Sequence, residues 1–283
     1  MQSTDGIVFA HQKRTHAVSS GGEATGEVGL ADVPAAGGCN QPEHSMIDNF
    51  TIARRFNGPP NSGNGGYVAG LFARCLAQPV NVRLQKPIPL ETPLSVRMQG
   101  ERWEAIDGDE IIAVASPATR KVPTAPATPT YAQAMQCARD APITGITGVF
   151  AHCFVCGGAR ADGDGLRILC GHLADDMVAA PWTPHANLAN EAGEIAPEFV
   201  WAALDCPGML AAFQDGRVAL LGELSVELLQ PVKAREPHVV VGWTIARAGR
   251  KRTAGTALLD NAGQCCAQGI ATWIEINSAA GDD

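Results

Sequence analysis

The spacing of apolar residues along the chain predicts where helices and strands lie. The segment 65–77 (GGYVAGLFARCLA) has the small and apolar spacing of a buried helix, and it follows a turn-rich stretch at 57–64. Three shorter segments then alternate or run apolar between turn residues, at 80–89, 94–103 and 110–116. This order predicts one helix followed by a meander of antiparallel strands.

The second half of the chain repeats that order. Segment 198–213 has the pattern of a buried helix. Strand-like segments follow at 218–229, 238–246, 253–259 and 264–276. Pro87 and Pro93 lie six residues apart after the first strand of the first half, and Pro231 and Pro237 repeat that spacing at the matching place. Equal spacing can arise by chance among 19 prolines, but the matching order of elements favours an internal duplication.

Residues 1–45 and 121–130 show neither the helical nor the strand spacing of apolar residues. Residues 1–45 are rich in Gly, Ser, Ala and Glu, which predicts a disordered tail. Three prolines at 121–130 remove backbone donors and favour a linker. The predicted organisation is a tail (1–45), a first domain (46–120), a proline-rich linker (121–147), a second domain (148–276) and a short tail (277–283). Each domain would be an α+β layer, and two such layers can pair their sheets edge to edge.

Composition and charge exclude several classes of function. The 283 residues are 46% hydrophobic, and the formal net charge of −8 comes without a cluster of Lys and Arg. Neither nucleic acid nor an anionic membrane is therefore an expected partner. No apolar run approaches the roughly 20 residues of a membrane helix, and the N-terminus has no basic region followed by an apolar one, so we expect a cytoplasmic protein. Nine cysteines without a secretory signal predict reduced thiols.

Two motifs point to a family. Segment 55–73 (RFNGPPNSGNGGYVAGLFA) places a glycine pair at the start of the helix after an Asn-containing loop. Segment 152–168 (HCFVCGGARADGDGLRI) contains Cys-Phe-x-Cys-Gly and then Gly-Leu. The first motif resembles hotdog-fold acyl-CoA thioesterases, and the second is similar to the lead-in before the first strand of some members. With the duplicated element order, the resemblance covers about 46–275. It implies α+β architecture with two tandem hotdog folds, each a long central helix wrapped by antiparallel sheet, forming an intrachain pseudo-dimer.

The resemblance also implies hydrolysis of an acyl thioester, carried by CoA or by a carrier protein. This reaction needs donors for the developing oxyanion, and a base for water or a carboxylate that attacks directly. Gly65 and Gly66 would present backbone N–H groups at a helix N-terminus, where the helix dipole favours negative charge. Both glycines are therefore expected at the catalytic site.

In relatives that form dimers of single hotdogs, an acid from the partner helix lies about nine positions after the glycine turn. Here the first half has Ala73 at that position and the second half has Asp205. Pro197 and Glu198 stand where the first half has its glycine pair. The resemblance therefore implies one working site per chain, with Asp205 as base or nucleophile and a decayed second site.

Other interpretations of these site residues stay open. Asp205 could instead cap the turn at 206–208, although burial among apolar neighbours would raise its pKa as a base requires. Asn64 stands where many relatives have His, and its amide can donate a hydrogen bond but cannot exchange protons. Ser225 is a candidate helper hydroxyl, with Glu223 a weaker candidate. The small face of the first helix predicts space for the acyl chain, so the expected substrate-binding residues are Asn61, Tyr67, Gly70 and Trp201.

A zinc site is an alternative use of the cysteines. Cys153-x-x-Cys156 followed by Cys170-x-His172 has the spacing of a four-ligand site. The first pair also belongs to the hotdog lead-in, and the second would follow a strand, so the favoured interpretation has no metal and needs no cofactor. A redox role for the first pair is a further alternative.

Three functions follow from the sequence. Thioester hydrolysis is favoured, and a non-catalytic acyl-thioester binding protein is the alternative. A hydratase or dehydratase on the same fold would need an Asp and His pair on one segment, which 57–73 lacks. Exposed sheet edges make a homodimer possible.

Overall fold

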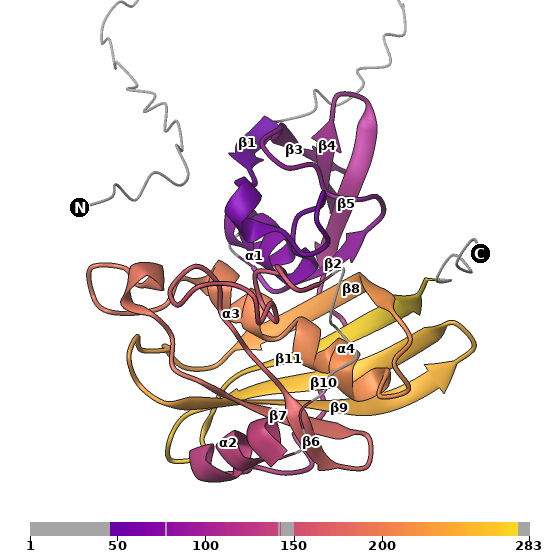
Figure 1. Ribbon diagram of the computed structural model, residues 1–283. Helices are drawn as coiled ribbons and strands as arrows, with labels where there is room; N and C mark the ends of the chain where they lie inside the picture. Colours follow the sequence, from indigo (N-terminus) through magenta and orange to yellow (C-terminus); the bar gives the residue numbers. More distant parts are fainter. Residues whose placement is uncertain (1–45, 77, 141, 143–149, 277–283) are drawn as a thin grey trace, which may run out of the picture.

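The computed structural model describes residues 46–76, 78–140, 142 and 150–276 (Figure 1). The segments predicted as disordered tails, 1–45 and 277–283, lie outside the described residues.

In its described residues, the first half contains one long helix and five strands. A 3-10 turn at Arg54–Phe56 precedes the helix α1 (Gly65–Leu76). The strands are β1 (Met46–Thr51), β2 (Val80–Leu84), β3 (Pro93–Gln99), β4 (Arg102–Asp107) and β5 (Glu110–Pro117). The single strand predicted at 94–103 is wrong, because the chain turns at Gly100, whose φ of 61° suits glycine, and returns as β4.

The second half contains six strands and three helices in its described residues. The helices are α2 (Tyr131–Asp140), α3 (Pro197–Ala203) and α4 (Cys206–Ala212), with a 3-10 turn at Ala186–Leu188. The strands are β6 (Gly171–Ala174), β7 (Met177–Trp182), β8 (Ala219–Leu228), β9 (His238–Ala248), β10 (Lys251–Leu259) and β11 (Cys265–Glu275).

The helix predicted at 198–213 is broken in two. It ends after Ala203, and the backbone leaves helical geometry at Asp205, where φ is −82° and ψ is −86°. Pro207 follows two residues later, and its ring nitrogen cannot donate to a preceding turn, so the chain starts a new helix there. The break places Asp205 between two helices.

The predicted linker contains the helix α2. Thr130 and Gln133 form a capping box: the Gln133 side chain accepts from the Thr130 N–H at 2.8 Å, and the Thr130 hydroxyl accepts from the Gln133 N–H at 3.3 Å. Ala134 packs against Ala179 and Val241 on one face of the sheet. The helix forms at Tyr131–Asp140 because no proline lies between Pro129 and Pro142 and good helix formers stand between them.

All eleven strands of the described residues form one antiparallel sheet. Their order is β1-β3-β4-β5-β2-β8-β11-β10-β9-β7-β6. β2 and β8 join the two halves through three residue pairs, which include Asn81 with Ser225 and Val82 with Leu224. In Figure 1 the first half stands above the longer strands of the second, with α1 and α3 at the boundary. This arrangement confirms two tandem hotdog units paired edge to edge.

The helices α1 and α3 pack closely at Gly70, where a side chain would not fit. A Cβ on Gly70 would lie 2.7 Å from the Trp201 Cβ and 2.7 Å from the Glu198 Cα. α3 therefore occupies the space directly beside Gly70, while part of the small face of α1 lines a cavity described below.

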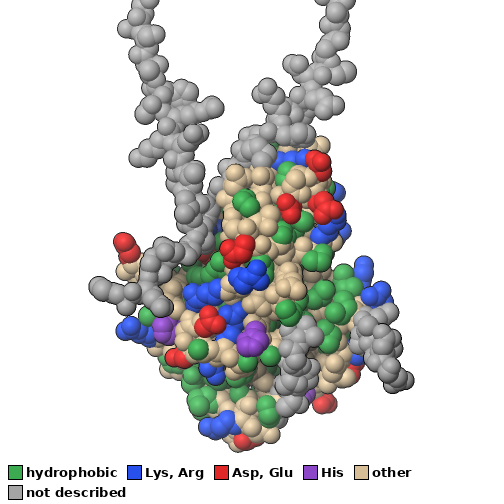
Figure 2. Space-filling model, turned by 45° about the horizontal axis from the view of Figure 1, so that its top comes forward, with side chains coloured by type: hydrophobic (Ala, Val, Ile, Leu, Met, Phe, Trp, Pro, Cys, Tyr) green, Lys and Arg blue, Asp and Glu red, His purple; other side chains and the backbone are tan. Residues whose placement is uncertain are grey.

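The surface shows no single-signed face in the view of Figure 2, where Lys and Arg side chains are interspersed with Asp and Glu. Within the described residues, no helix is both long enough and apolar enough to cross a membrane.

Candidate active site

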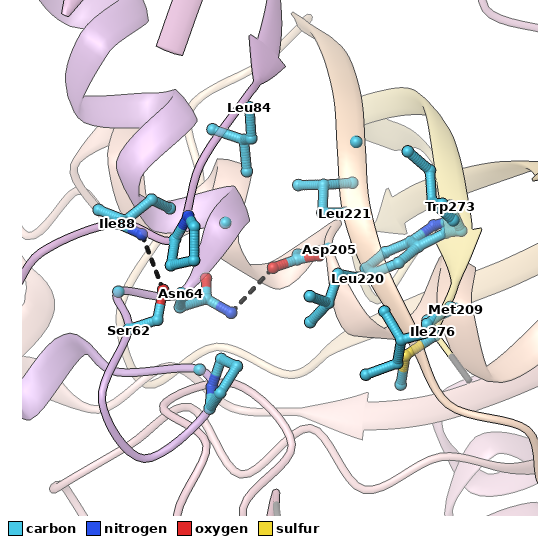
Figure 3. A pocket seen from close by; sticks show the side chains of 18 of the residues that line it. Ser62, Asn64, Leu84, Ile88, Asp205, Met209, Leu220, Leu221, Trp273 and Ile276 are labelled. Atoms are coloured by element: carbon cyan, nitrogen blue, oxygen red, sulfur yellow. Dashed lines mark hydrogen bonds between the residues drawn. The ribbon is translucent and has the colours of Figure 1, made fainter. Parts of the chain in front are cut away.

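The Asp205 carboxylate is bound by the first turn of α1. Its Oδ2 atom accepts hydrogen bonds from the Asn64 Nδ2 at 2.8 Å and from the Gly66 backbone N–H at 2.9 Å (Figure 3). Asp205 is only 2% exposed, and its side chain makes no capping bond to α4. The alternative in which Asp205 caps its own turn is therefore wrong, because the side chain crosses to the other half of the chain.

Asn64 orients this contact through both ends of its amide. Its Oδ1 accepts from the Tyr67 N–H at 2.9 Å, which caps the start of α1. This bond leaves Nδ2 directed at Asp205. The same side chain thus starts the helix and holds the carboxylate.

The close approach requires glycine at position 66. A Cβ there would lie 2.5 Å from the Asp205 Cβ and 2.9 Å from the Trp201 carbonyl oxygen. Gly66 was predicted as an oxyanion donor, but its N–H is already bonded to Asp205. Gly65 lines the cavity in the first turn, where backbone N–H groups have no partner within a helix.

Burial raises the pKa of Asp205 to about 7, against the lowering effect of the Gly66 N–H bond. The nearby Cys153 raises the pKa further, and the Asn64 hydrogen bond lowers it. Among the described residues, none forms a hydrogen bond with the other carboxylate oxygen, Oδ1. A buried carboxylate oxygen without a partner is costly in a purely structural role, and a base needs one free.

A mainly apolar cavity of about 400 Å³ lies beside the carboxylate (Figure 3). Asn64, Gly65 and Asp205 form part of its wall. Apolar side chains from both halves form much of the rest, namely Leu84, Ile88, Met209, Leu220, Leu221, Trp273 and Ile276. The sequence pattern did not single out these side chains, because the segments that carry them come together only when both halves are folded.

Four of the predicted catalytic residues come together and one does not. Asn64, Gly65, Gly66 and Asp205 meet at the cavity described above. Ser225 lies at the β2–β8 junction, where its hydroxyl donates to the Asn81 Oδ1 at 2.8 Å. It lines a different cavity, so it is not placed to assist Asp205.

None of the predicted substrate-binding residues lines the cavity beside Asp205. Asn61 is exposed, and Tyr67 is fully buried with its ring stacked on Phe56 at a centroid distance of 4.1 Å. Gly70 and Trp201 line the other cavity. The assignment of these four residues to substrate binding therefore stays a prediction.

The second potential site carries an ion pair instead of a glycine turn and an acid. Arg74 contacts the Glu198 Oε1 through Nη1 at 2.7 Å, and Pro197 begins α3 without an N–H to offer. The adjoining cavity of about 800 Å³ is lined by Arg74, Pro197, Trp201 and Ser225 among others. The ion pair and the proline make this region chemically different from the surroundings of Asp205.

The lead-in motif at 152–168 forms a loop tied to the first half by Arg160. The buried guanidinium donates to the Arg55 carbonyl at 2.7 Å, to the His152 carbonyl at 2.9 Å and to the Asp164 carboxylate at 2.8 Å. Phe154 from the same motif packs edge-on against Phe56 at 5.0 Å between ring centroids. These contacts place Cys153 on the wall of the cavity, next to Asp205.

The zinc ligands suggested by spacing do not all come together. Cys153 and Cys156 lie close to Cys206, which sequence reasoning did not consider. Cys170 is buried and His172 is exposed, and neither joins this group. None of the eight cysteines in the described part of the chain forms a disulfide with another.

Comparison with solved structures shows the fold. A tesB protein of Mycobacterium avium subsp. paratuberculosis is 12% identical and matches 83% of this chain and 96% of its own, with a TM-score of 0.53. A putative thioesterase of Novosphingobium aromaticivorans is 11% identical and matches 80% of this chain and 94% of its own, also at 0.53. A thioesterase superfamily protein at 20% identity is matched over 39% of this chain and 57% of its own length, with a TM-score of 0.37.

The tandem hotdog architecture is therefore shared with structures described as thioesterases. No protein-family model matches the chain, and no curated protein sequence matches it significantly.

Proposed function

We propose that the protein hydrolyses an acyl thioester, of CoA or of an acyl carrier protein, in the cavity beside Asp205. The observation that carries the proposal is the Asp205 carboxylate. It is buried on the wall of an apolar cavity, with one oxygen held by the first turn of α1 and the other without a hydrogen-bond partner among the described residues. The fold shared with thioesterases supports the same reaction class.

The reaction replaces the C–S bond of the thioester with a C–O bond and releases a thiol and a carboxylic acid. The Gly65 N–H, at the positive end of α1, stabilises the oxyanion that forms on the carbonyl. The Asn64 amide and the Gly66 N–H fix Oδ2 of Asp205. Oδ1 then either takes a proton from the attacking water or attacks the carbonyl itself.

Labelled water separates these two routes. Direct attack by Asp205 expels the thiolate and forms a mixed anhydride. In a single turnover in H₂¹⁸O, water that attacks the aspartyl carbonyl of this anhydride leaves ¹⁸O in Asp205 and ¹⁶O in the acid. Water activated by Asp205 as a base labels the acid and never Asp205, so ¹⁸O in Asp205 identifies direct attack. Mass spectrometry of the peptide that contains Asp205 measures the difference.

The test of the proposal is thiol release from short, medium, long and aromatic acyl-CoAs. Asp205→Asn keeps the shape of the side chain but removes the base and nucleophile, so we expect a loss of about 10²–10⁴-fold in kcat. Glu198→Gln is the matched control, since Glu198 stands at the second potential site and pairs with Arg74. We expect this control to retain turnover.

Two results would contradict the proposal. Equal turnover of Asp205→Asn and wild type would remove Asp205 from the reaction. Saturable binding of acyl-CoA by the wild type without thiol release from any member of the panel would replace hydrolysis with non-catalytic acyl-thioester binding.

A further inference from the structure

Three cysteine thiols lie close together at the wall of the cavity beside Asp205. The Sγ atoms of Cys153, Cys156 and Cys206 all lie within 4.8 Å of one another, and those of Cys153 and Cys206 are 3.8 Å apart. Cys153 and Cys206 also line the cavity beside Asp205. The thiols come from two distant segments, the lead-in loop and the first residue of α4.

The spacing suits a tetrahedral metal ion. A Zn–S bond is about 2.3 Å long, so two sulfur ligands of one tetrahedral zinc are about 3.8 Å apart. The Cys153–Cys206 separation of 3.8 Å has that length. Thiolate ligands in tetrahedral geometry favour zinc among the common biological cations.

The loop around Cys153 has the backbone of a metal-binding knuckle. The Gly157 N–H donates to the Cys153 carbonyl at 2.9 Å, and a Cβ on Gly157 would lie 2.4 Å from that oxygen. A tight Cys-x-x-Cys-Gly turn therefore brings two sulfurs to one side.

We propose that Cys153, Cys156 and Cys206 bind one zinc ion, each as a thiolate whose proton leaves to solvent. Three protein ligands leave one tetrahedral position for water or a small ligand. The ion would tie the lead-in loop to the start of α4 and so fix the break in which Asp205 lies. This inference does not depend on thioester hydrolysis.

Metal content of the full-length protein tests the proposal. The protein is purified with a phosphine reductant and without chelators, and zinc is measured by inorganic mass spectrometry. We expect about one zinc per chain in the wild type, and a small fraction of that in Cys206→Ser and in Cys156→Ser. Cys170→Ser is the matched control, because Cys170 is a buried thiol outside the group, and it should keep its zinc.

Cobalt substitution gives a second measurement that needs no activity. Co²⁺ in the wild type should show sulfur-to-cobalt charge-transfer absorption in the near ultraviolet, and Cys206→Ser should lose it. Circular dichroism checks that each variant is folded. Cys156 is only half-buried, so its variant keeps the test valid if Cys206→Ser fails to fold.

Three results would overturn the proposal. One is a reduced wild-type protein that contains no zinc and takes up neither Zn²⁺ nor Co²⁺ at neutral pH. Another is zinc retained at the same level in both Cys206→Ser and Cys156→Ser. The third is a disulfide between two of these three cysteines, found by peptide mapping after purification with reductant.

Discussion

Asn64 shows how one residue serves both the local structure and the candidate site. Its Oδ1 caps α1 and its Nδ2 holds Asp205. Asn is among the best residues at a helix start, so its presence there is predicted by local chemistry alone. The second bond was not predictable from the sequence, since it depends on where a residue 141 positions away lies.

Gly66→Ala tests the close approach at the residue scale. The added methyl carbon would lie 2.5 Å from the Asp205 Cβ, so the helix and the carboxylate must move apart. We expect a loss of about 1–3 kcal/mol in the free energy of unfolding and a fall in kcat of at least about 10²-fold. Urea unfolding and thiol release measure these effects.

Gly158→Ala is the control for that variant. The nearest atom to its added carbon is 3.8 Å away, which is ordinary contact, so both stability and turnover should stay close to wild type. If Gly66→Ala behaves like Gly158→Ala, the close approach is not what holds the Asp205 carboxylate.

At the scale of elements, the break between α3 and α4 places Asp205 at the candidate site. In a continuous helix at 198–213, Asp205 would lie inside a regular turn. The break instead places it at the junction of two helices, where its side chain makes no capping bond to α4. Pro207 was visible in the sequence as a signal for this break. Its consequence for Asp205 was not, because the direction of a side chain at a helix junction depends on packing of both helices.

His238, the first residue of β9, gives a prediction about pH. Its ring is buried, and burial lowers its pKa, although the carbonyl of Glu236 and the charges of Glu236 and Asp260 act in the opposite direction. The folded protein therefore prefers neutral His238, while the unfolded chain takes up a proton below a pH of about 6.5. The stabilising contribution is complete above that pH and is lost as pH falls toward the folded-state pKa.

Urea unfolding at pH 7.5 and 5.5 measures this contribution. Wild type should lose more stability over this interval than His238→Asn, by at most about 1.4 kcal/mol per pH unit. An equal loss in both proteins would show that His238 titrates alike in the folded and unfolded states.

At the scale of the whole molecule, the duplication was predictable and the asymmetry only partly so. Repeated element order and the exchange of Gly65–Gly66 for Pro197–Glu198 indicated two units and one complete site. The structure adds that Arg74 and Glu198 pair where a second site would lie. The cavity beside Asp205 was not predicted, since its walls come from both halves and no local pattern brings them together.

The asymmetry predicts the binding stoichiometry. A non-hydrolysable thioether analogue of a good acyl-CoA substrate should bind at about one molecule per chain, because the second potential site lacks both the glycine turn and the acid. Isothermal titration calorimetry measures the ratio. Two equivalent sites per chain would contradict the prediction.

Pairing of two chains stays a prediction. β1 and β6 are the edges of the eleven-stranded sheet, and either edge offers backbone groups to a partner. Light scattering coupled to size exclusion gives the mass in solution that decides between one chain and two.

Because the two halves are fused in one chain, a single substitution alters one half and not the other. In a symmetric dimer of identical subunits, one substitution alters both sites together. Here the surroundings of Asp205 and those of the Arg74–Glu198 pair are encoded separately. The region around that pair can therefore drift, or be redesigned for another ligand, without a matching change beside Asp205.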